Sequence, residues 1–346
     1  MSNCFSPPAE PGVYLTEIKN IGFIYNTNLG KRFDSQLGYV PKEGFSSVFF
    51  CNNDDSKIRI TITNEGFRFN DHYFSTDSKL LAVGDSFTFG KQVSNSDTWP
   101  ACLERKLNLG VDNGGVNGYG AAQALKRGMI EINKKKYSTF ILSILVGVDF
   151  SRDRYSYKFG NPKPAVIQTN KGITWSPVSD PDKIGSSFHP LIPSKIFIFF
   201  YERSLIFSLM ADYLTDNFNF KGNYLTKIHT NAADINSIIK WTIKMFHDVP
   251  DVDKILLLQY AENINSENVL SERKLILATA KKLSLKVVDT FNCFKKYKPK
   301  EIWFSQGGHH TPFGNKIVCN YLFKQAFKSK INKDGHLPAA EPHPRQ

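Results

Sequence analysis

The sequence has few cysteines, and none of them is placed for metal binding. The cysteines of this 346-residue chain are widely spread, and no two have the spacing of a zinc-binding or redox pair. This spacing excludes a zinc-ribbon or CxxC domain, and we expect no metal centre. We interpret all five as reduced core or surface thiols, which favours a cytoplasmic protein; they are Cys4, Cys51, Cys102, Cys293 and Cys319.

The sequence also lacks the long apolar runs of exported and membrane-spanning chains. The N-terminus does not show a basic start followed by an apolar stretch, so no signal peptide is expected. The longest mid-chain apolar stretch, at residues 196–200, meets Glu202 and Arg203 too early to cross a bilayer. We therefore expect no transmembrane segment and a cytoplasmic location.

A nucleic-acid-binding motif is also missing, although the chain is basic. The formal net charge of +12 permits an anionic partner such as nucleic acid, a phospholipid surface or an acidic polysaccharide. The lysines are scattered, however, and the densest run is only Lys134 to Lys136. Scattered charge favours a compositional bias over a binding patch, and we expect no nucleic-acid partner.

The apolar content, 41% of residues, is sufficient for a sizeable core. Residues 1–75 contain short β-like runs and are predicted to form a small β-rich extension. From residue 79 strands alternate with helices, which predicts a three-layer α/β/α domain over residues 76–330 with a parallel sheet covered on both faces. Strands are expected at 80–83, 140–146, 254–259 and 286–288, and helices at 98–107, 121–134, 233–247, 267–283 and 312–327.

Two segments stand apart from this alternation. Prolines divide residues 151–232 into loops, within which an aromatic helix is expected at 194–214. We interpret this segment as an insertion that covers one face of the site. Residues 331–346 contain three further prolines and are predicted to form a disordered tail.

The most informative motif follows the first expected strand. Gly84 permits a sharp turn after the apolar run 80–83, and Asp85 and Ser86 begin the next element. A serine at the carboxyl end of a parallel strand lies where open α/β sheets build their sites. The competing interpretation is a turn in which Asp85 and Ser86 only cap the next helix. Positions 118, 149 and 289 also follow strand-like runs, and their convergence at one sheet edge favours a functional Ser86.

Two further motifs offer the remaining parts of a serine hydrolase, which needs a base and donors for the oxyanion. The Gly-rich segment 113–120 is expected to be a loop after a strand, with accessible backbone N–H groups. His309 stands beside glycines just before the last expected helix, where it can act as a general base. The alternative interpretations are an ordinary flexible loop for residues 113–120 and a surface position for His309.

Together, these motifs resemble the SGNH (GDSL-type) hydrolase superfamily. Residues 84–90 (GDSFTFG) resemble its nucleophile block, residues 113–118 its second block, and His309 followed by Gly314 its last block. Residues 33–39 and 64–68 are similar to the N-terminal extension of many bacterial members. The resemblance covers about residues 33–150 and 254–327, and it implies a flavodoxin-like sheet.

The resemblance implies an esterase-type hydrolase that needs no cofactor. Ser86 is then the nucleophile and His309 the general base, while the backbone N–H groups of Ser86 and Gly118 bind the oxyanion. The implied substrate is an acyl ester of a carbohydrate or a lipid. An O-acyltransferase that uses the same serine, and a weakly active or non-catalytic acyl-glycan-binding protein, are the alternatives.

The chain departs from the superfamily pattern at two places. Val148 occupies the position of an oxyanion-donating Asn, and loss of one such donor typically costs about 10²–10³ in rate. Gly307 and Gln306 occupy the positions where the pattern places an Asp before the histidine, and a missing triad acid costs on the order of 10⁴ in well-studied serine proteases.

The resemblance therefore leaves open which group orients the imidazole of His309. The amide oxygen of Gln306 is one candidate, and the carboxylate of Asp289 or of Glu301, brought in by the fold, is another. Asp85 and Asp149 are expected to have structural roles close to the site.

Overall fold

The computed structural model of the protein describes residues 4–5, 30–51, 56–72, 80–158, 161–179, 226–305 and 308–328. Its centre is a five-stranded sheet in the order β15-β14-β8-β6-β7, in which every neighbouring pair is parallel. If these five strands are numbered 1 to 5 in chain order, their order across the sheet from β7 to β15 is 2-1-3-4-5, which is the flavodoxin-like order. The strands are β6 (Leu80–Gly84), β7 (Val111–Gly115), β8 (Thr139–Leu145), β14 (Asp253–Gln259) and β15 (Lys286–Asp289).

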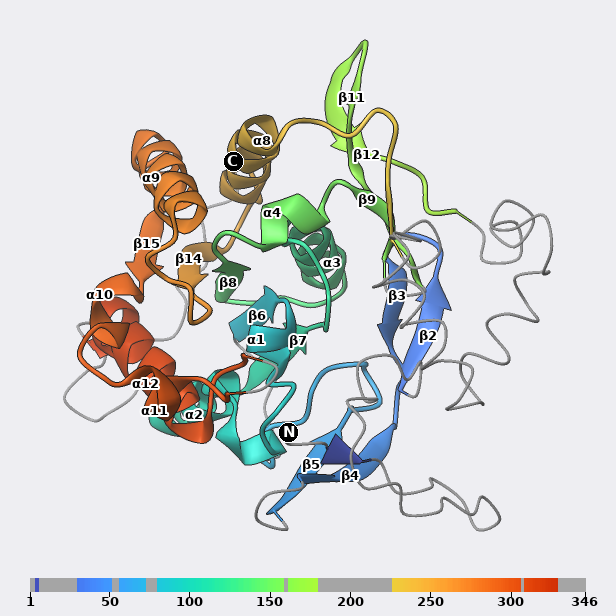
Figure 1. Cartoon of the computed structure of the whole chain (residues 1–346). Coiled ribbons are helices and arrows are strands. Elements are labelled where there is room, and N and C mark those ends of the chain that lie inside the picture. Colours follow the sequence, from blue (N-terminus) through green and yellow to red (C-terminus); the bar gives the residue numbers. More distant parts are fainter. Residues whose placement is uncertain are drawn as a thin grey trace, which may run out of the picture.

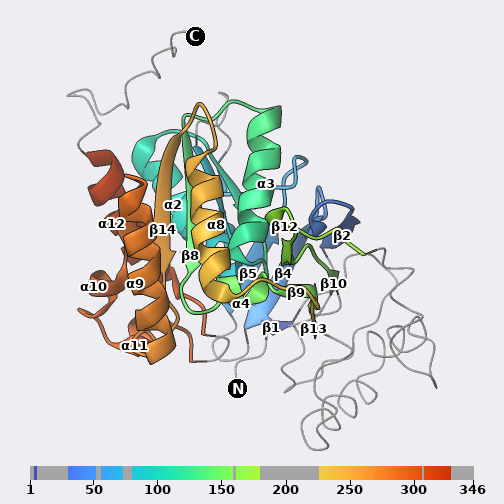
Figure 2. The same ribbon diagram turned by 90° about the horizontal axis from the view of Figure 1, so that it is seen from above.

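Helices cover both faces of this sheet, which confirms the predicted three-layer α/β/α fold (Figures 1 and 2). The central strands are mainly apolar because helices cover both faces of the sheet, and Leu80 to Val83 are fully buried. On one side lie α2 (Trp99–Leu107) and α12 (Pro312–Leu322), and on the other lie α3 (Ala121–Lys134), α8 (Ile235–His247) and α9 (Glu267–Lys282). The strands and helices expected for the sheet and its two helical layers begin and end within two residues of the observed ones, if η4 (Phe323–Phe327), a π-helical turn, is counted with α12.

Shorter elements link these layers. The helical turns are α1 (Ser86–Phe89), η2 (Asn95–Asp97), α4 (Asp149–Arg152), α10 (Phe291–Phe294) and α11 (Pro299–Ile302). Small antiparallel sheets are made by β2 (Lys31–Asp34) with β3 (Gly38–Pro41), by β1 (Cys4–Phe5), β4 (Ser46–Cys51) and β5 (Ser56–Thr61), by β9 (Tyr155–Lys158), β10 (Asn161–Pro162) and β13 (Thr226–Ile228), and by β11 (Val166–Thr169) with β12 (Gly172–Trp175).

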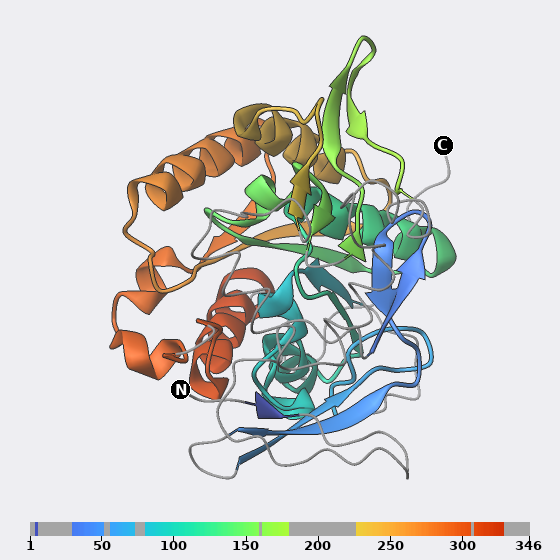
Figure 3. The same ribbon diagram turned by 45° about the vertical axis from the view of Figure 1, so that its right-hand side comes forward.

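The hairpins β2–β3 and β4–β5 lie away from α9 and β15, as Figures 1 and 3 show. The β4–β5 hairpin is joined to the central sheet through Arg68, which is fully buried: its Nη2 donates to Arg59 O at 3.2 Å and its backbone N–H donates to Asn113 O at 2.9 Å. The expected aromatic helix at 194–214 and the expected tail at 331–346 lie outside the described residues. Within the described residues, no helix is long and apolar enough to cross a membrane.

One part of the Gly-rich segment differs from the expectation. Asn113 to Gly115 do not form a loop but the end of β7, paired in parallel with Ala82 to Gly84 of β6. The two glycines belong in this strand because their neighbours approach closely. A Cβ at Gly115 would lie 2.3 Å from Phe89 N, and a Cβ at Gly114 would lie 3.1 Å from a methyl group of Val83.

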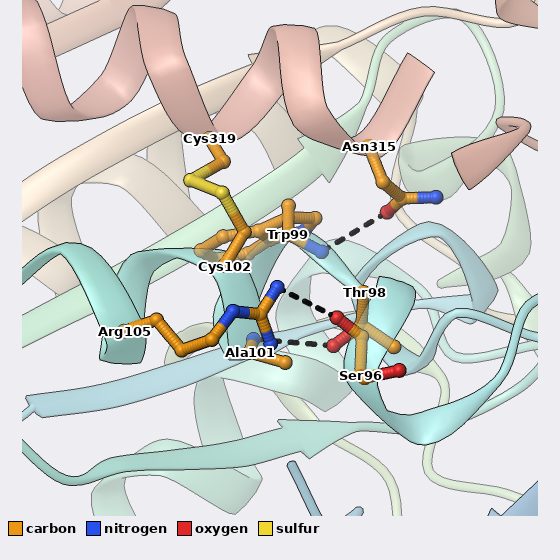
Figure 4. The surroundings of a disulfide bond; sticks show 8 residues. All are labelled: Ser96, Thr98, Trp99, Ala101, Cys102, Arg105, Asn315 and Cys319. Atoms are coloured by element: carbon orange, nitrogen blue, oxygen red, sulfur yellow. Dashed lines mark hydrogen bonds between the residues drawn. A yellow bond between two sulfur atoms is a disulfide. The ribbon is translucent and has the colours of Figure 1, made fainter. Parts of the chain in front are cut away.

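The prediction of reduced thiols is wrong at two positions. Cys102 on α2 and Cys319 on α12 form a disulfide, with their Cα atoms 6.1 Å apart (Figure 4). The two cysteines are 217 residues apart in sequence, so spacing carried no signal of their contact. The bond removes the thiol-based reason for expecting a cytoplasmic protein. Cys293 is a free cysteine, and burial raises the pKa of its thiol to about 12.

Loss of this disulfide is expected to destabilise the fold. The double substitution Cys102→Ser and Cys319→Ser should lower the free energy of unfolding by about 2–5 kcal/mol, because a long loop is no longer closed in the unfolded chain. Urea unfolding followed by tryptophan fluorescence measures this change. A reductant should destabilise the natural sequence and add nothing to the double variant; equal stability of the two proteins without reductant would contradict the role of the bond.

Candidate active site

Ser86 lies at the switch point of the sheet, where β6 stands between β7 and β8. The cap of the following turn is Asp85, whose Oδ1 accepts a hydrogen bond from Phe87 N at 2.8 Å. The Ser86 hydroxyl is therefore not used for capping. Gly84 is required by close packing, since a Cβ there would lie 2.3 Å from Thr88 Oγ1 and 2.9 Å from Ser143 O.

The structure brings Ser86 and His309 together. His309 Nε2 lies 2.8 Å from Ser86 Oγ, so the hydroxyl can donate directly to the ring. The ring of Phe87 packs against the imidazole with 5.0 Å between centroids. This is the contact that a nucleophile and its general base require.

The other ring nitrogen of His309 contacts Gln92, which the sequence analysis did not identify. His309 Nδ1 lies 2.8 Å from Gln92 Oε1, and the backbone N–H of His309 points to the same atom at 3.3 Å. Because a backbone N–H can only donate, the atom that faces it must be the amide oxygen. The ring therefore donates from Nδ1 and keeps Nε2 free to accept from Ser86.

The two acids expected as orienting groups are bound elsewhere in the described part of the chain. Glu301 Oε2 accepts from Lys298 N at 2.8 Å. Gln306 lies outside the described residues. Asp289 is bound elsewhere, where its carboxylate accepts from Tyr260 Oη at 2.7 Å and from Arg273 Nε at 2.8 Å. A local signal for Gln92 does exist in the sequence. Gly90 ends α1 with a φ of +74°, and this turn brings the chain back beside Ser86.

His309 and its neighbour His310 have different surroundings, which separates their roles. His310 is almost fully buried, and its Nε2 lies 3.2 Å from Tyr260 O, a carbonyl that also accepts from Trp303 Nε1. Burial lowers the pKa of His310 to about 3, so it stays neutral at ordinary pH. His310 is thus a core residue, and His309 is the histidine at the serine.

The half-buried guanidinium of Arg152 joins three loops of the site. Arg152 Nη1 donates to Asp85 Oδ2 and to Asp149 Oδ1, both at 2.8 Å, and contacts Tyr119 O at 3.2 Å. Burial lowers the pKa of Arg152, but the two carboxylates outweigh burial and raise it. Burial, followed by the charge of Asp85, raises the pKa of Asp149 well above its usual range. Both acids are held in structural contacts, and Asp85 Oδ2 is 3.4 Å from Ser86 Oγ.

Gly118 follows β7, the strand next to β6. It has a φ of +82°, in a turn where Tyr119 N donates to Val116 O at 3.2 Å. Tyr39 Oη donates to Asn117 O at 2.9 Å and supports the same turn. A positive φ favours glycine, so this position is constrained by backbone geometry.

Val148 follows β8 and offers only its backbone for hydrogen bonding. Its side chain packs against the core, and its carbonyl accepts from Ser151 Oγ at 2.7 Å. The preceding turn is held by α9, where Glu272 Oε1 accepts from Gly147 N at 2.5 Å. Burial raises the pKa of Glu272 to about 7, although the Gly147 N–H opposes this rise.

The fold and the site define an α/β protein with a serine–histidine–glutamine chain at its switch point. In the described part of the molecule, no group of three or more His, Cys, Asp or Glu is arranged to hold a metal ion. No family model matches the sequence, and no curated protein matches it.

Several solved structures do match. One is a member of the lipolytic protein G-D-S-L family from Veillonella parvula, at 12% identity and a TM-score of 0.39, over 72% of this chain and 98% of that one. A lipase/acylhydrolase from Enterococcus faecalis matches at 12% identity and a TM-score of 0.40, over 71% of this chain and 94% of that one. A catalytic mutant of an acetylxylan esterase from Geobacillus stearothermophilus matches at 13% identity and a TM-score of 0.40, over 74% of this chain and 98% of that one.

Removal of the Arg152 guanidinium should destabilise the protein strongly. Arg152→Met leaves Asp85 and Asp149 buried without their cation, and we expect a loss of about 3–5 kcal/mol in the free energy of unfolding. The matched control is Arg32→Met, which breaks an exposed pair with Glu43 and should cost about 1 kcal/mol or less. Urea unfolding of both variants measures the difference. Similar losses in the two variants would contradict the role given to Arg152.

Proposed function

We propose that this protein is an SGNH-type serine hydrolase that cleaves an acyl ester. The observation that carries the proposal is the chain of hydrogen bonds from Ser86 Oγ to His309 Nε2 and from His309 Nδ1 to Gln92 Oε1. It supplies a nucleophile, a base and a group that fixes the base, which is the arrangement of serine hydrolases.

In the proposed reaction, Ser86 Oγ attacks the ester carbonyl carbon and its proton passes to His309 Nε2. The carbonyl oxygen becomes an oxyanion, which the backbone N–H groups of Ser86 and Gly118 stabilise. When the bond to the alcohol breaks, His309 returns the proton to the leaving oxygen. A water molecule, deprotonated by His309, then attacks the acyl-enzyme, and Ser86 regains its proton.

Two features of the site reduce its catalytic power. Gln92 orients the imidazole but carries no negative charge, so it stabilises the imidazolium less than a carboxylate does. Val148 provides no side-chain donor, and loss of one oxyanion donor costs about 10²–10³ in rate. These features favour, as a second candidate, a weakly active protein that binds an acylated glycan.

The substrate class that we propose is an acyl ester of a carbohydrate or lipid, and transfer of the acyl group to a sugar hydroxyl uses the same steps with the hydroxyl in place of water. We further propose that residues 76–330 form the hydrolase domain, with residues 1–75 as an extension and 151–232 as an insertion. The support is that all five strands of the central sheet lie between Leu80 and Asp289.

A fluorophosphonate probe tests the nucleophile. The probe should label the natural sequence at Ser86 and should fail to label Ser86→Ala, because the phosphonyl group reacts only with an activated serine. The matched control is Ser271→Ala, an exposed serine on α9, which should be labelled as fully as the natural sequence. Labelling that persists in Ser86→Ala, or that is absent from the natural sequence beside a labelled control hydrolase, would contradict the proposal.

Substitutions of Gln92 test the orienting group. Gln92→Ala should lower kcat on the order of 10², because the ring of His309 is no longer held in position. Gln92→Glu should move the acidic limb of the kcat/KM profile to higher pH by about 1–2 units, because a carboxylate favours the protonated imidazole.

The pH–rate profiles of the natural sequence and of both Gln92 variants, recorded on one ester, provide the comparison. Thermal unfolding of each variant shows that the fold is retained. Identical profiles in all three proteins would exclude Gln92 as the group that orients His309.

A further inference from the structure

A cleft of about 500 Å³ lies between α2 and the first turns of α12, and it opens onto the disulfide. Cys102 is among the residues that line this cleft, and Figure 4 shows its side chain reaching across to Cys319 on α12. Cys102 is half-buried, whereas Cys319 is fully buried. A reagent in the cleft therefore meets the Cys102 side of the bond.

The cleft carries an excess of positive charge beside the disulfide. Among the residues that the structure describes, it is lined by three exposed cations, Arg105, Lys106 and Lys316, and by one acid, Asp97. Arg105 and Lys106 lie three and four residues after the cysteine of α2, and Lys316 lies three residues before the cysteine of α12. Such spacings place side chains on one face of a helix, so cations flank the bond from both helices.

The contacts of these cations leave much of their charge available. Arg105 Nη2 donates to a neutral group, the carbonyl of Ser96, at 2.8 Å. Lys106 holds its Nζ 5.2 Å from the centre of the Phe323 ring, which is also neutral. The charge of Arg105 lowers the pKa of Asp97, but burial raises that pKa by more. The cleft therefore favours an anionic visitor over a neutral one.

A disulfide is opened by a thiolate that can reach one of its sulfur atoms, and nearby lysine and arginine stabilise thiolates. We propose that Cys102 is a thiol-exchange site for small thiols that carry a carboxylate, and that exchange there opens the link which keeps Ser86 and His309 in contact. The exchange itself is independent of catalysis. Its effect on the reactivity of Ser86 rests on the proposed hydrolase function.

The exchange has two steps. In the first, the thiolate of the reagent attacks Cys102 Sγ; a bond forms between these two sulfur atoms, the bond to Cys319 breaks, and Cys319 leaves as a thiolate that takes a proton from water. In the second, another thiolate attacks the reagent's sulfur in this mixed disulfide and releases Cys102 as a thiolate. The two electrons that reduce the protein come from two reagent thiols, which leave as their own disulfide.

Two thiols that differ in charge test the selectivity of the cleft. N-acetylcysteine carries a carboxylate, and N-acetylcysteine amide carries a neutral group in its place. Each rate of reduction, followed by alkylation and mass spectrometry, is divided by the rate of the same thiol with a small neutral disulfide. The normalised rate of N-acetylcysteine should be about fivefold higher, the size of one contact between charges in water, and about 1 M salt should remove the difference. Equal normalised rates at low salt would overturn the inference.

Lysine variants test the origin of this selectivity. Lys106→Gln combined with Lys316→Gln should remove most of the advantage of the charged thiol, because two of the three cations are lost. The matched control combines Lys240→Gln with Lys274→Gln, two exposed lysines on α8 and α9 in the other helical layer, and should keep the advantage. An advantage that survives the first pair of substitutions would overturn the role given to the cleft.

Single cysteine variants test which sulfur is attacked. Cys319→Ser leaves the thiol of Cys102 at the cleft, whereas Cys102→Ser leaves the buried thiol of Cys319. Oxidised glutathione should modify the first variant about tenfold faster than the second, with circular dichroism showing that both are folded. Mapping of the mixed disulfide in the natural sequence, trapped with acid, answers the same question if a variant does not fold. Modification at Cys319 instead of Cys102 would overturn the inference.

The rate of fluorophosphonate labelling tests the link to the candidate site. Protein reduced at this bond, at a temperature where circular dichroism shows it folded, should be labelled at Ser86 about tenfold more slowly than the oxidised form, because the position of His309 is less fixed. Reoxidation should restore the rate. Equal rates in the two folded forms would overturn the control of the site by this bond. Absence of Ser86 labelling in the oxidised form would instead contradict the hydrolase proposal, and the exchange measurements would still decide the role of Cys102.

Discussion

The contact between α2 and α12 is the constraint on which the candidate site depends. Ser86 and Gln92 belong to the segment that leads into α2, whereas His309 belongs to the segment that leads into α12. These segments are joined by the Cys102–Cys319 disulfide and by Trp99 N, which donates to Asn315 Oδ1 at 3.1 Å (Figure 4). A short distance from serine to histidine therefore requires that the two helices stay in register.

The electrostatics of the site are set by Arg152 on the serine side and by Gln92 on the histidine side. Arg152 holds Asp85 and Asp149 and so places a cation, rather than unpaired acids, next to the nucleophile turn. On the histidine side, an amide oxygen replaces the usual carboxylate. The neutral Gln92 stabilises the imidazolium less than a carboxylate would.

Much of the fold could be predicted from the sequence because the signals are local. Apolar runs at the strands and amphipathic patterns at the helices gave boundaries close to the observed ones, and the order of elements implied a parallel sheet. Ser86 and His309 were identified because glycine-rich motifs flank both of them. Asn113 to Gly115 were misassigned because glycine signals a loop locally, and only the packing of Val83 and Phe89 shows that a strand needs it.

The remaining features depend on contacts between distant segments, which a single sequence does not show. The disulfide joins residues 217 positions apart. The bond between Gln92 and His309 arises from the turn at Gly90 and from the packing of α12, and the three loops around Arg152 meet only after the sheet has formed. The superfamily pattern places an acid just before the histidine in sequence. The observed partner of His309 is Gln92, which lies six residues after Ser86.

Nitrogen NMR spectroscopy of the His309 ring, in isotopically labelled protein, tests the central claim most directly, because it reports which ring nitrogen carries the proton. The contacts described here predict a neutral ring with the proton on Nδ1, directed at Gln92, and with Nε2 accepting from Ser86. They also predict that Gln92→Ala changes the Nδ1 signal and that Ser86→Ala changes the Nε2 signal. A proton on Nε2, or signals that neither substitution affects, would contradict the serine–histidine–glutamine arrangement.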